Sequence, residues 1–324
     1  MKRRWIGLFG LVALALTTAT GAQPNGVAYP LRPIRMVVPW PPGQATDVTA
    51  RLIAQKLSEA LGQPVVLDNR PGAGGLIGTD IAAKAAPDGY TLLAASSGPI
   101  SISPLVQKTT FNVERDFAPV AKLVISPYVL VTNTAFPATN AREFIALLKA
   151  SPGKYAFGSS GTGASAHLIT EWFNNSAGVQ ATHVPYKGGS PVMAALLSGE
   201  VPVSFSSLPT VLPFKANGRL RVIAVTSARR SPSAPEIPAI AETLDGYEVT
   251  QWYGILAPAK TAGSVISALN AAVAKAVSTE SARQQFAASG TIASATTPAA
   301  FRELIETEIA KWTKVFKSGA ITLR

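Results

Sequence analysis

The chain has 324 residues, no cysteine, and 29 Lys and Arg against 18 Asp and Glu, which gives a net charge of +11. The lack of cysteine excludes disulfides, thiol catalysis and lipid attachment at a cysteine, while the length is enough for two domains with hydrophobic cores. The basic residues are scattered, with no run beyond Arg229-Arg230, so we expect no nucleic-acid partner and a mild positive field that attracts anions.

The N-terminus has the organisation of a secretion signal. Basic residues at positions 2–4 precede an apolar run over residues 6–16, and small residues follow up to Ala22. The run is too short to cross a bilayer, so a cleavable signal peptide over residues 1–22 is predicted. Cleavage as late as Ala28 and a membrane anchor are the alternatives. We therefore expect export to the periplasm, without a lipid anchor.

Strand-like and helix-like runs alternate through the first part of the mature chain. The apolar patterns predict strands over residues 34–38, 65–67 and 90–95 and helices over residues 48–61 and 74–86. Such alternation is typical of mainly parallel sheets with helices on both faces. Ligands of these sheets usually lie outside the carboxyl ends of the strands.

The middle of the chain repeats this alternation. It predicts strands over residues 155–158, 182–185, 201–205 and 220–225, separated by helices that end near Lys149, Asn174 and Leu197. Asn140 with Glu143 is expected to cap the first of these helices, and Ser190 with Pro191 to open the last.

Two β-rich runs, residues 120–132 and 249–257, are placed to carry the chain between two domains. Two crossings build one domain from both ends of the chain and the other from its middle. The expected first domain covers residues 29–125 plus 253–324, and the second covers 126–252.

The last helix is predicted from a single apolar stripe. Thr297 and Pro298 open the helix, and Gly319 closes it. The stripe consists of Phe301, Leu304, Ile305, Ile309, Trp312 and Phe316. We expect it to pack against the first domain.

A stiff loop, Pro39 to Asp47, joins the first strand to the first helix. A strand, a turn and then a helix leave free backbone N–H groups at the positive end of the helix dipole, which attracts anions. Thr46 or Asp47 is expected to cap this helix. The candidate ligand-binding residues of the loop are Trp40, Pro42, Gly43, Gln44, Thr46 and Asp47.

A second loop of the same kind, residues 158–165, follows a strand in the middle of the chain. Its hydroxyls and glycine amides are donors suited to a carboxylate. Serine pairs also end two strands at what should be the same edge, although solvated loops would explain them equally well. The candidates are Ser159, Gly161, Thr162, Gly163, Ser165, His167 and Tyr186, together with Ser96, Ser97 and Ser206 at the strand ends.

Other chemistries have weaker support. Gly161-x-Gly163-x-x-Ala166 matches a relaxed dinucleotide fingerprint, but the expected acid about 20 residues later is missing. Without a Gly-x-Ser-x-Gly elbow, a serine hydrolase would need a serine of the second loop with His167, and this stays the alternative function. The two histidines, without cysteine or a carboxylate cluster, do not form a metal site. We therefore expect no cofactor, no metal and no enzyme activity.

Five motifs occur in an order that resembles a known family. They are Val38-Pro39-Trp40-Pro41-Pro42-Gly43 with Asp47 and Arg51, the stretch Asn69 to Gly75, the stretch Pro87 to Leu92, Ser160-Gly161-Thr162-Gly163 with His167-Leu168, and the stretch Val184 to Gly189. Together they resemble the Bug or TctC-type solute receptors of tripartite tricarboxylate transporters over essentially the whole mature chain.

The resemblance implies a type II periplasmic binding protein with two α/β domains in a Venus-flytrap arrangement, two crossover strands and a central cleft. It implies capture of a small mono- or dicarboxylate by loop backbone groups and its delivery to the membrane permease subunits of a tripartite transporter. Presentation of the ligand to a sensor kinase is the alternative, and the receptor is expected to be a monomer. Gln44 stands where the family usually has a second glycine, which leaves the ligand class open.

Overall fold

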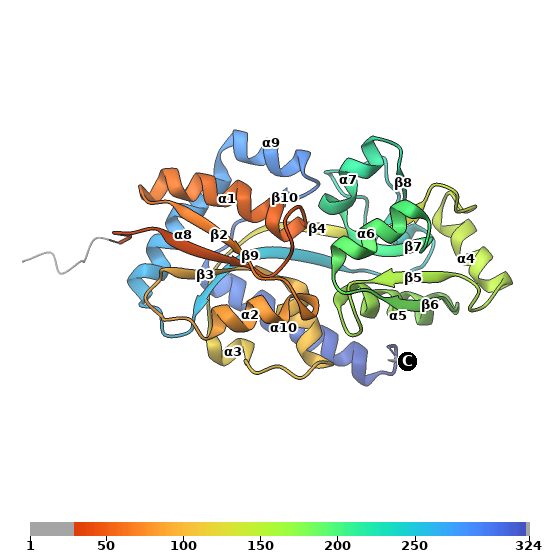
Figure 1. The fold of residues 1–324 in the computed structure, drawn as a ribbon, viewed down its shortest axis with the longest axis horizontal. Coiled ribbons are helices and arrows are strands. Elements are labelled where there is room, and N and C mark those ends of the chain that lie inside the picture. Colours follow the sequence, from red (N-terminus) through yellow and green to blue (C-terminus); the bar gives the residue numbers. More distant parts are fainter. Residues whose placement is uncertain (1–28, 322–324) are drawn as a thin grey trace, which may run out of the picture.

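The computed structural model describes residues 29–321 (Figure 1). The predicted signal peptide lies outside the described residues. Within residues 29–321, no helix is long and apolar enough to span a bilayer. The described chain forms two lobes, seen on the left and the right of Figure 1, and two long strands run between them.

The first lobe is a parallel sheet covered by helices. Its strands are β1 (Ile34–Val38), β2 (Val65–Asn69) and β3 (Thr91–Ser96), and its longer helices are α1 (Ala45–Leu61), α2 (Leu76–Ala83), α8 (Gly263–Ser278) and α9 (Glu280–Ala288). Short turns η1 (Ala73–Gly75), η2 (Gly98–Ile102), η3 (Ser103–Leu105) and α3 (Val113–Asp116) connect them. β1 pairs in parallel with both β2 and β3. Ile53 and Leu57 of α1 share a buried core with Val273 of α8, as the spacing of the apolar residues predicts.

The second lobe has the same layering. Its strands are β5 (Ala156–Ser159), β6 (Thr182–Pro185), β7 (Val203–Ser207) and β8 (Leu220–Val225), and its helices are α4 (Ala141–Ala150), α5 (Ser165–Ala177), α6 (Gly189–Ser198), α7 (Leu208–Ala216) and the short η4 (Ile240–Glu242). β5 pairs in parallel with β6 and β7. In the core, Phe173 of α5 packs against Phe144, Phe205 and Tyr247 at ring-centroid distances of 5.8, 5.5 and 5.7 Å.

The two crossover strands are β4 (Phe117–Asn133) and β9 (Thr250–Pro258), which pair antiparallel with each other. β4 also pairs with β7 and β8 of the second lobe and with the short β10 (Ile292–Ala293), while β9 pairs with β3 of the first lobe. The resulting order β2-β1-β3-β9-β4-β7-β5-β6 places parallel strands on each side of an antiparallel centre. The predicted α/β fold with two crossover strands is confirmed, and Pro127 lies where β4 leaves β9 for β7.

The last helix, α10 (Pro298–Lys317), packs against both lobes. Phe301 packs on Trp252 of β9 at a ring-centroid distance of 4.9 Å, whereas Trp312 packs on Trp172 of α5 at 5.5 Å. The expectation that the whole stripe packs against the first domain is therefore wrong. The reason is length, because a helix of 20 residues extends about 30 Å and passes the junction between the lobes.

Local capping signals in the sequence predict some helix ends correctly and others incorrectly. Gly62 ends α1 in the left-handed conformation, at φ 67°, and the Thr297 hydroxyl accepts the N–H of Ala300 at the start of α10. Ser190 does not cap α6. That helix begins at Gly189, because Gly188 adopts a φ of 112° that favours glycine and ends the preceding turn there.

Candidate functional site

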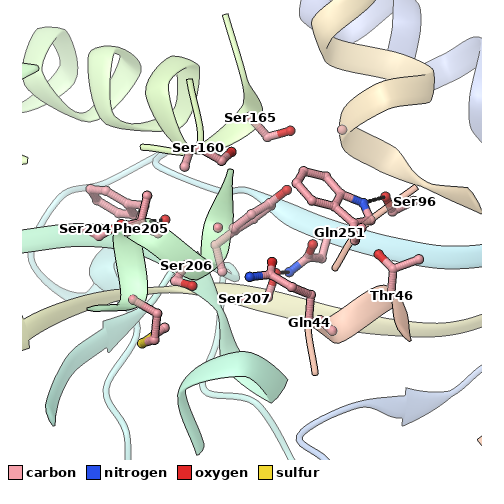
Figure 2. A pocket seen from close by; sticks show the side chains of 18 residues that line it. Gln44, Thr46, Ser96, Ser160, Ser165, Ser204, Phe205, Ser206, Ser207 and Gln251 are labelled. Carbon is pink, nitrogen blue, oxygen red and sulfur yellow. Dashed lines mark hydrogen bonds between the residues drawn. The ribbon is translucent and has the colours of Figure 1, made fainter. Parts of the chain in front are cut away.

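A cavity lies between the lobes, where the carboxyl ends of β1 and β5 face each other. It has a volume of about 70 Å³, and because one water molecule needs about 10–15 Å³ on this scale, it has room for a small solute. The first lobe lines it with Trp40, Gln44, Ala45, Thr46, Ser96 and Gly98; the rest of the wall is Tyr128, Ser160, Ser165, Ala166, Gly189, Val192, Met193, Ser204, Phe205, Ser206, Ser207 and Gln251 (Figure 2). Among these described residues there is no Lys, Arg, His, Asp or Glu.

Two long helices begin at this cavity from opposite lobes. Gln44 precedes α1 and Ala164 precedes α5, and neither residue caps its helix with a side chain. Within residues 29–321, no acceptor bonds the backbone N–H groups of Thr46, Ser165 or Ala166. The free amides and the positive helix ends therefore make the cavity favourable for an anion.

Two further helices add to this field. α6 starts at Gly189 and α7 follows Ser207, and neither has a side-chain cap. Gly189 and Ser207 both line the cavity. Tyr128 adds a neutral phenol, since burial raises its pKa to about 12. The cavity is thus rich in hydrogen-bond donors, although no cation lines it in the part of the chain that the structure describes.

The first loop is anchored from behind by Asp47. Its carboxylate accepts hydrogen bonds from the N–H of Gly43 (2.9 Å), from Nδ2 of Asn69 (2.9 Å) and from Nε and Nη2 of Arg51 (2.8 and 3.0 Å). Burial alone would raise the pKa of Asp47, but the hydrogen bonds from Arg51, Asn69 and Gly43 outweigh it and lower the pKa. Asp47 therefore stays charged and fully engaged, and it does not line the cavity.

The prediction that Thr46 or Asp47 caps the first helix is wrong. α1 begins at Ala45, so Gln44 is the N-cap residue, and Thr46 and Asp47 lie inside the first turn. The N–H of Ala45 is bonded by Oγ1 of Thr210 from the second lobe (3.1 Å) rather than by its own loop. The helix begins earlier than expected, and the carboxylate of Asp47 accepts from Gly43, Asn69 and Arg51 instead of capping it.

The second loop is anchored by the two histidines. Nδ1 of His167 accepts the N–H of Gly163 at 3.0 Å, and the rings of His167 and His183 stack with centroids 3.7 Å apart. Burial, with a smaller effect from His183, lowers the pKa of His167 to about 4, and burial also lowers the pKa of His183. Both rings are neutral at physiological pH, so the second loop is held without charge.

The serine–histidine pair of the hydrolase alternative does not form as expected. His183, and not His167, contacts a serine of the loop, with Nε2 at 2.6 Å from Oγ of Ser159. Oγ of Ser159 also lies 3.0 Å from the carbonyl oxygen of Gly161 and 3.2 Å from the N–H of Gly161, so its hydroxyl group is bonded within its own loop. Ser159 is also buried, which makes it a structural residue of the loop.

The cavity contains only part of the predicted set. Of the predicted residues, Trp40, Gln44, Thr46, Ser96, Ser165 and Ser206 line it. A neighbouring cavity of about 320 Å³, which shares Ser160 with the first, is lined by Gly161, Thr162 and Tyr186. The other predicted residues, Pro42, Gly43, Asp47, Ser97, Ser159, Gly163 and His167, line neither cavity. Several of them instead hold the loops in place.

Sequence reasoning missed the contribution of the crossover strands. Tyr128 of β4 and Gln251 of β9 form part of the wall, and Gln251 donates to Oγ of Ser207 at 2.8 Å. Their neighbours Pro127 and Thr250 line a different pocket, which contains neither Tyr128 nor Gln251. The sequence held no signal that marked Tyr128 and Gln251 as wall residues. The same is true of Val192 and Met193 of α6, since core helices carry the same residues.

No group of three or more His, Asp or Glu side chains within residues 29–321 could hold a metal ion. The hydroxyl and amide side chains that line the cavity offer hydrogen bonds to a polar solute. Trp40 fits this role, since its Nε1 donates to Oγ of Ser96 at 3.2 Å while its ring forms part of the wall.

Comparison with known proteins identifies the family. Residues 49–321 match the tripartite tricarboxylate transporter family receptor. The chain is 38% identical to protein BugT of Bordetella pertussis (strain Tohama I) over 323 residues, which cover 98% of each chain.

Two solved structures are similar along nearly their whole length. An R. palustris protein solved with adipate is 34% identical, with a TM-score of 0.87, and the match covers 91% of this chain and 99% of that one. MatC from Rhodopseudomonas palustris, solved with bound malate, is 29% identical, with a TM-score of 0.83 and coverage of 89% and 99%. The chain therefore belongs to the tripartite tricarboxylate transporter receptor family, and it is a periplasmic solute-binding receptor rather than an enzyme.

Proposed function

We propose that this receptor captures a small carboxylate between its lobes and delivers it to the membrane permease subunits of a tripartite transporter. The observation that carries the proposal is the meeting of two uncapped helix starts, at Thr46 and Ser165, across one cavity. An acid that enters the cavity accepts hydrogen bonds from both lobes at once. It therefore binds best when the lobes are together.

Neutral donors are sufficient for this binding. A hydrogen bond from a neutral donor to a charged acceptor contributes about 1.5–3 kcal/mol, and several such donors converge on the cavity. The free amides of Thr46 and Ser165 and the hydroxyl groups of Ser96 and Ser206 surround a space of suitable size. Adipate and malate in the two related structures support the same ligand class, a mono- or dicarboxylate.

Transport requires a path from capture to the permease. We propose that residues 1–22 direct export and are removed, and that the receptor acts as a monomer without a lipid anchor. The lobes, residues 29–125 plus 253–324 and residues 126–252, close about β4 and β9 when the acid binds. The family match to transporter receptors supports delivery to the permease.

A melting experiment with matched ligands tests the proposal. Succinate, malate and adipate are compared with their neutral diamides at the same millimolar concentrations. A ligand that binds the native state alone raises the melting temperature, so we expect the acids to raise it and the diamides to leave it unchanged. Equal shifts from acids and diamides, or no shift from any acid, would overturn the proposal.

A pair of variants at Ser165 tests the role of the helix amides. Ser165 is the first residue of α5, and Ala164 before it is extended, with φ −72° and ψ 157°, which suits a residue before proline. Ser165→Pro removes the N–H, while Ser165→Ala keeps it and removes the hydroxyl group. We expect Ser165→Pro to bind the acid at least tenfold more weakly than Ser165→Ala. Equal affinities would show that this amide does not bind the ligand.

A further inference from the structure

Gln44 reaches across the cavity to the facing lobe. It occupies the N-cap position of α1, where its side chain makes no capping hydrogen bond. Instead, its amide lies over Gly189, the first residue of α6, so closely that a Cβ placed on Gly189 would overlap Oε1 and Nε2 of Gln44. Both residues line the cavity, and Figure 2 shows Gln44 beside Ser207 and Gln251.

The backbone conformation at position 189 does not require a glycine. The preceding Gly188 has a φ of 112°, but Gly189 is not among the glycines with positive φ. A residue in a helix with ordinary dihedrals would be more stable as alanine than as glycine. The missing side chain is therefore needed for space, and the amide of Gln44 takes up that space.

The contact limits the length of the cavity on the α6 side. The cavity is small, at about 70 Å³, and Gln44 lines it, so the side-chain atoms of Gln44 beyond Cβ take up space that a longer ligand would need. Gly189 and Val192 of α6 line the same cavity beside Gln44, so the amide fills space against the start of α6. The amide also presents a donor and an acceptor, so the wall is polar and suits a polar end of a ligand.

We propose that Gln44, seated on Gly189, sets the chain length of the bound acid: it favours dicarboxylates of about four carbons, meets their far end with its amide, and weakens the binding of longer ones. This inference rests on the proposed function of the same cavity. An acid of six carbons or more would need the space that Gln44 occupies. Removing the side chain opens that space toward α6 and takes away a hydrogen-bond partner of short acids.

The test is a calorimetric titration with malonate, succinate, glutarate, adipate and pimelate under one set of conditions. In the wild type, we expect the affinity to peak at succinate and to fall at least tenfold by adipate. In Gln44→Ala, adipate should gain at least tenfold and succinate should lose at least threefold. Gln55→Ala, an exposed glutamine on the same helix, is the matched control and should keep the wild-type profile.

A second variant tests the contact itself. Gly189→Ala forces the amide of Gln44 away from residue 189, so the chain-length profile of this variant should differ from that of the wild type. Once Gln44 is alanine, the contact no longer exists. The double variant Gln44→Ala/Gly189→Ala should therefore have the same profile as Gln44→Ala. Circular dichroism and melting curves verify that each variant is folded.

The outcomes separate the two proposals. A wild-type optimum at adipate or longer, or the same profile in the wild type and in Gln44→Ala while acids still bind, would overturn the chain-length role of Gln44 and leave the carboxylate receptor intact. If the folded wild type binds no acid of the series, the proposed function fails, and the role of Gln44 fails with it.

Discussion

The two loops that face each other across the cavity are held in different ways. The first is anchored by a charged cluster in which Asp47 bonds Arg51, Asn69 and the backbone of Gly43. The second is anchored by neutral rings, with His167 bonded to the backbone of Gly163 and stacked on His183. In both cases the anchor lies behind the loop, outside the wall of the cavity.

The two kinds of anchor show how a protein can build an anion site without a cation in its wall. If the anchors lined the cavity, Asp47 would repel a carboxylate and the histidines would make the site depend on pH. Because they bond loop amides away from the cavity instead, the amides of Thr46 and Ser165 stay free for a ligand. The two loops should therefore respond differently to mutation and to acid.

The largest expected effect is at the charged anchor. Asp47→Ala removes a carboxylate whose side chain is 1% exposed, leaves the N–H of Gly43 without its acceptor and takes one of two acceptors from Asn69, so we expect a loss of about 3 kcal/mol in the free energy of unfolding. Urea denaturation measures it. Asp88→Ala, which breaks an exposed ion pair with Arg32 and an exposed hydrogen bond from the N–H of Tyr90, should cost about 1 kcal/mol. Equal costs would mean that the charged anchor does not hold the first loop.

The neutral anchor should weaken in acid. The folded pKa of His167 is about 4, below the ordinary 6.5, so its contribution to stability is complete above pH 6.5 and is lost as the pH falls toward 4. By pH 5 the loss should reach about 2 kcal/mol. His167→Gln, which keeps an acceptor for Gly163, should lack this part of the pH dependence. Urea midpoints at pH 7 and pH 5 that fall equally in both proteins would contradict the assignment.

A partly buried carboxyl group at the junction of the lobes, that of Glu308, should show the opposite trend. Burial raises the pKa of Glu308 to about 7, although the hydrogen bond from Nε1 of Trp252 (2.7 Å) opposes the shift. Its contribution is therefore present below pH 4.5 and is lost as the pH rises through 7. The pKa difference alone gives about 3 kcal/mol at pH 8, and solvent at this partly exposed side chain reduces it, so Glu308→Gln should be more stable than the wild type there by roughly 1–2 kcal/mol and equal to it near pH 4.5. A variant that is less stable at pH 8 would show that the charged form is favoured there.

The smallest effect is expected at Trp40 of the first loop. Trp40→Phe keeps most of the aromatic wall but loses the hydrogen bond to Ser96, so we expect a cost of about 1 kcal/mol and a several-fold loss of acid affinity. Trp172→Phe, in the core of the second lobe, is the control and should change stability without changing affinity. Calorimetry that shows no change of affinity in Trp40→Phe would remove Trp40 from the binding wall.

Features that depend on neighbouring residues were predictable from the sequence. The strand, turn and helix pattern located both loops, and the caps at Gly62 and Thr297 follow from local backbone and side-chain chemistry. The crossing strands were found because long β-rich runs with few turn residues are rare in an alternating fold. Motifs in order along the chain identified the family.

Features that depend on contacts between distant segments were not predictable in the same way. Thr210 bonds Ala45 from the other lobe, and Trp312 reaches the second lobe because α10 is long enough to pass the junction. The roles of Asp47 and His167 as anchors needed the orientation of their side chains, since the same residue types at the start of a helix also occur as ligands. The contact between the amide of Gln44 and Gly189 joins the two lobes, so it depends on how the lobes pack together.

The most direct test of the central claim is to follow backbone amide signals by nuclear magnetic resonance while the ¹⁵N-labelled receptor is titrated with succinate. Binding by two helix starts predicts that the amides of Thr46, Ser165 and Ala166 move together and saturate at one ligand concentration. Amides that stay unchanged at both helix starts while succinate saturates another part of the molecule would contradict it.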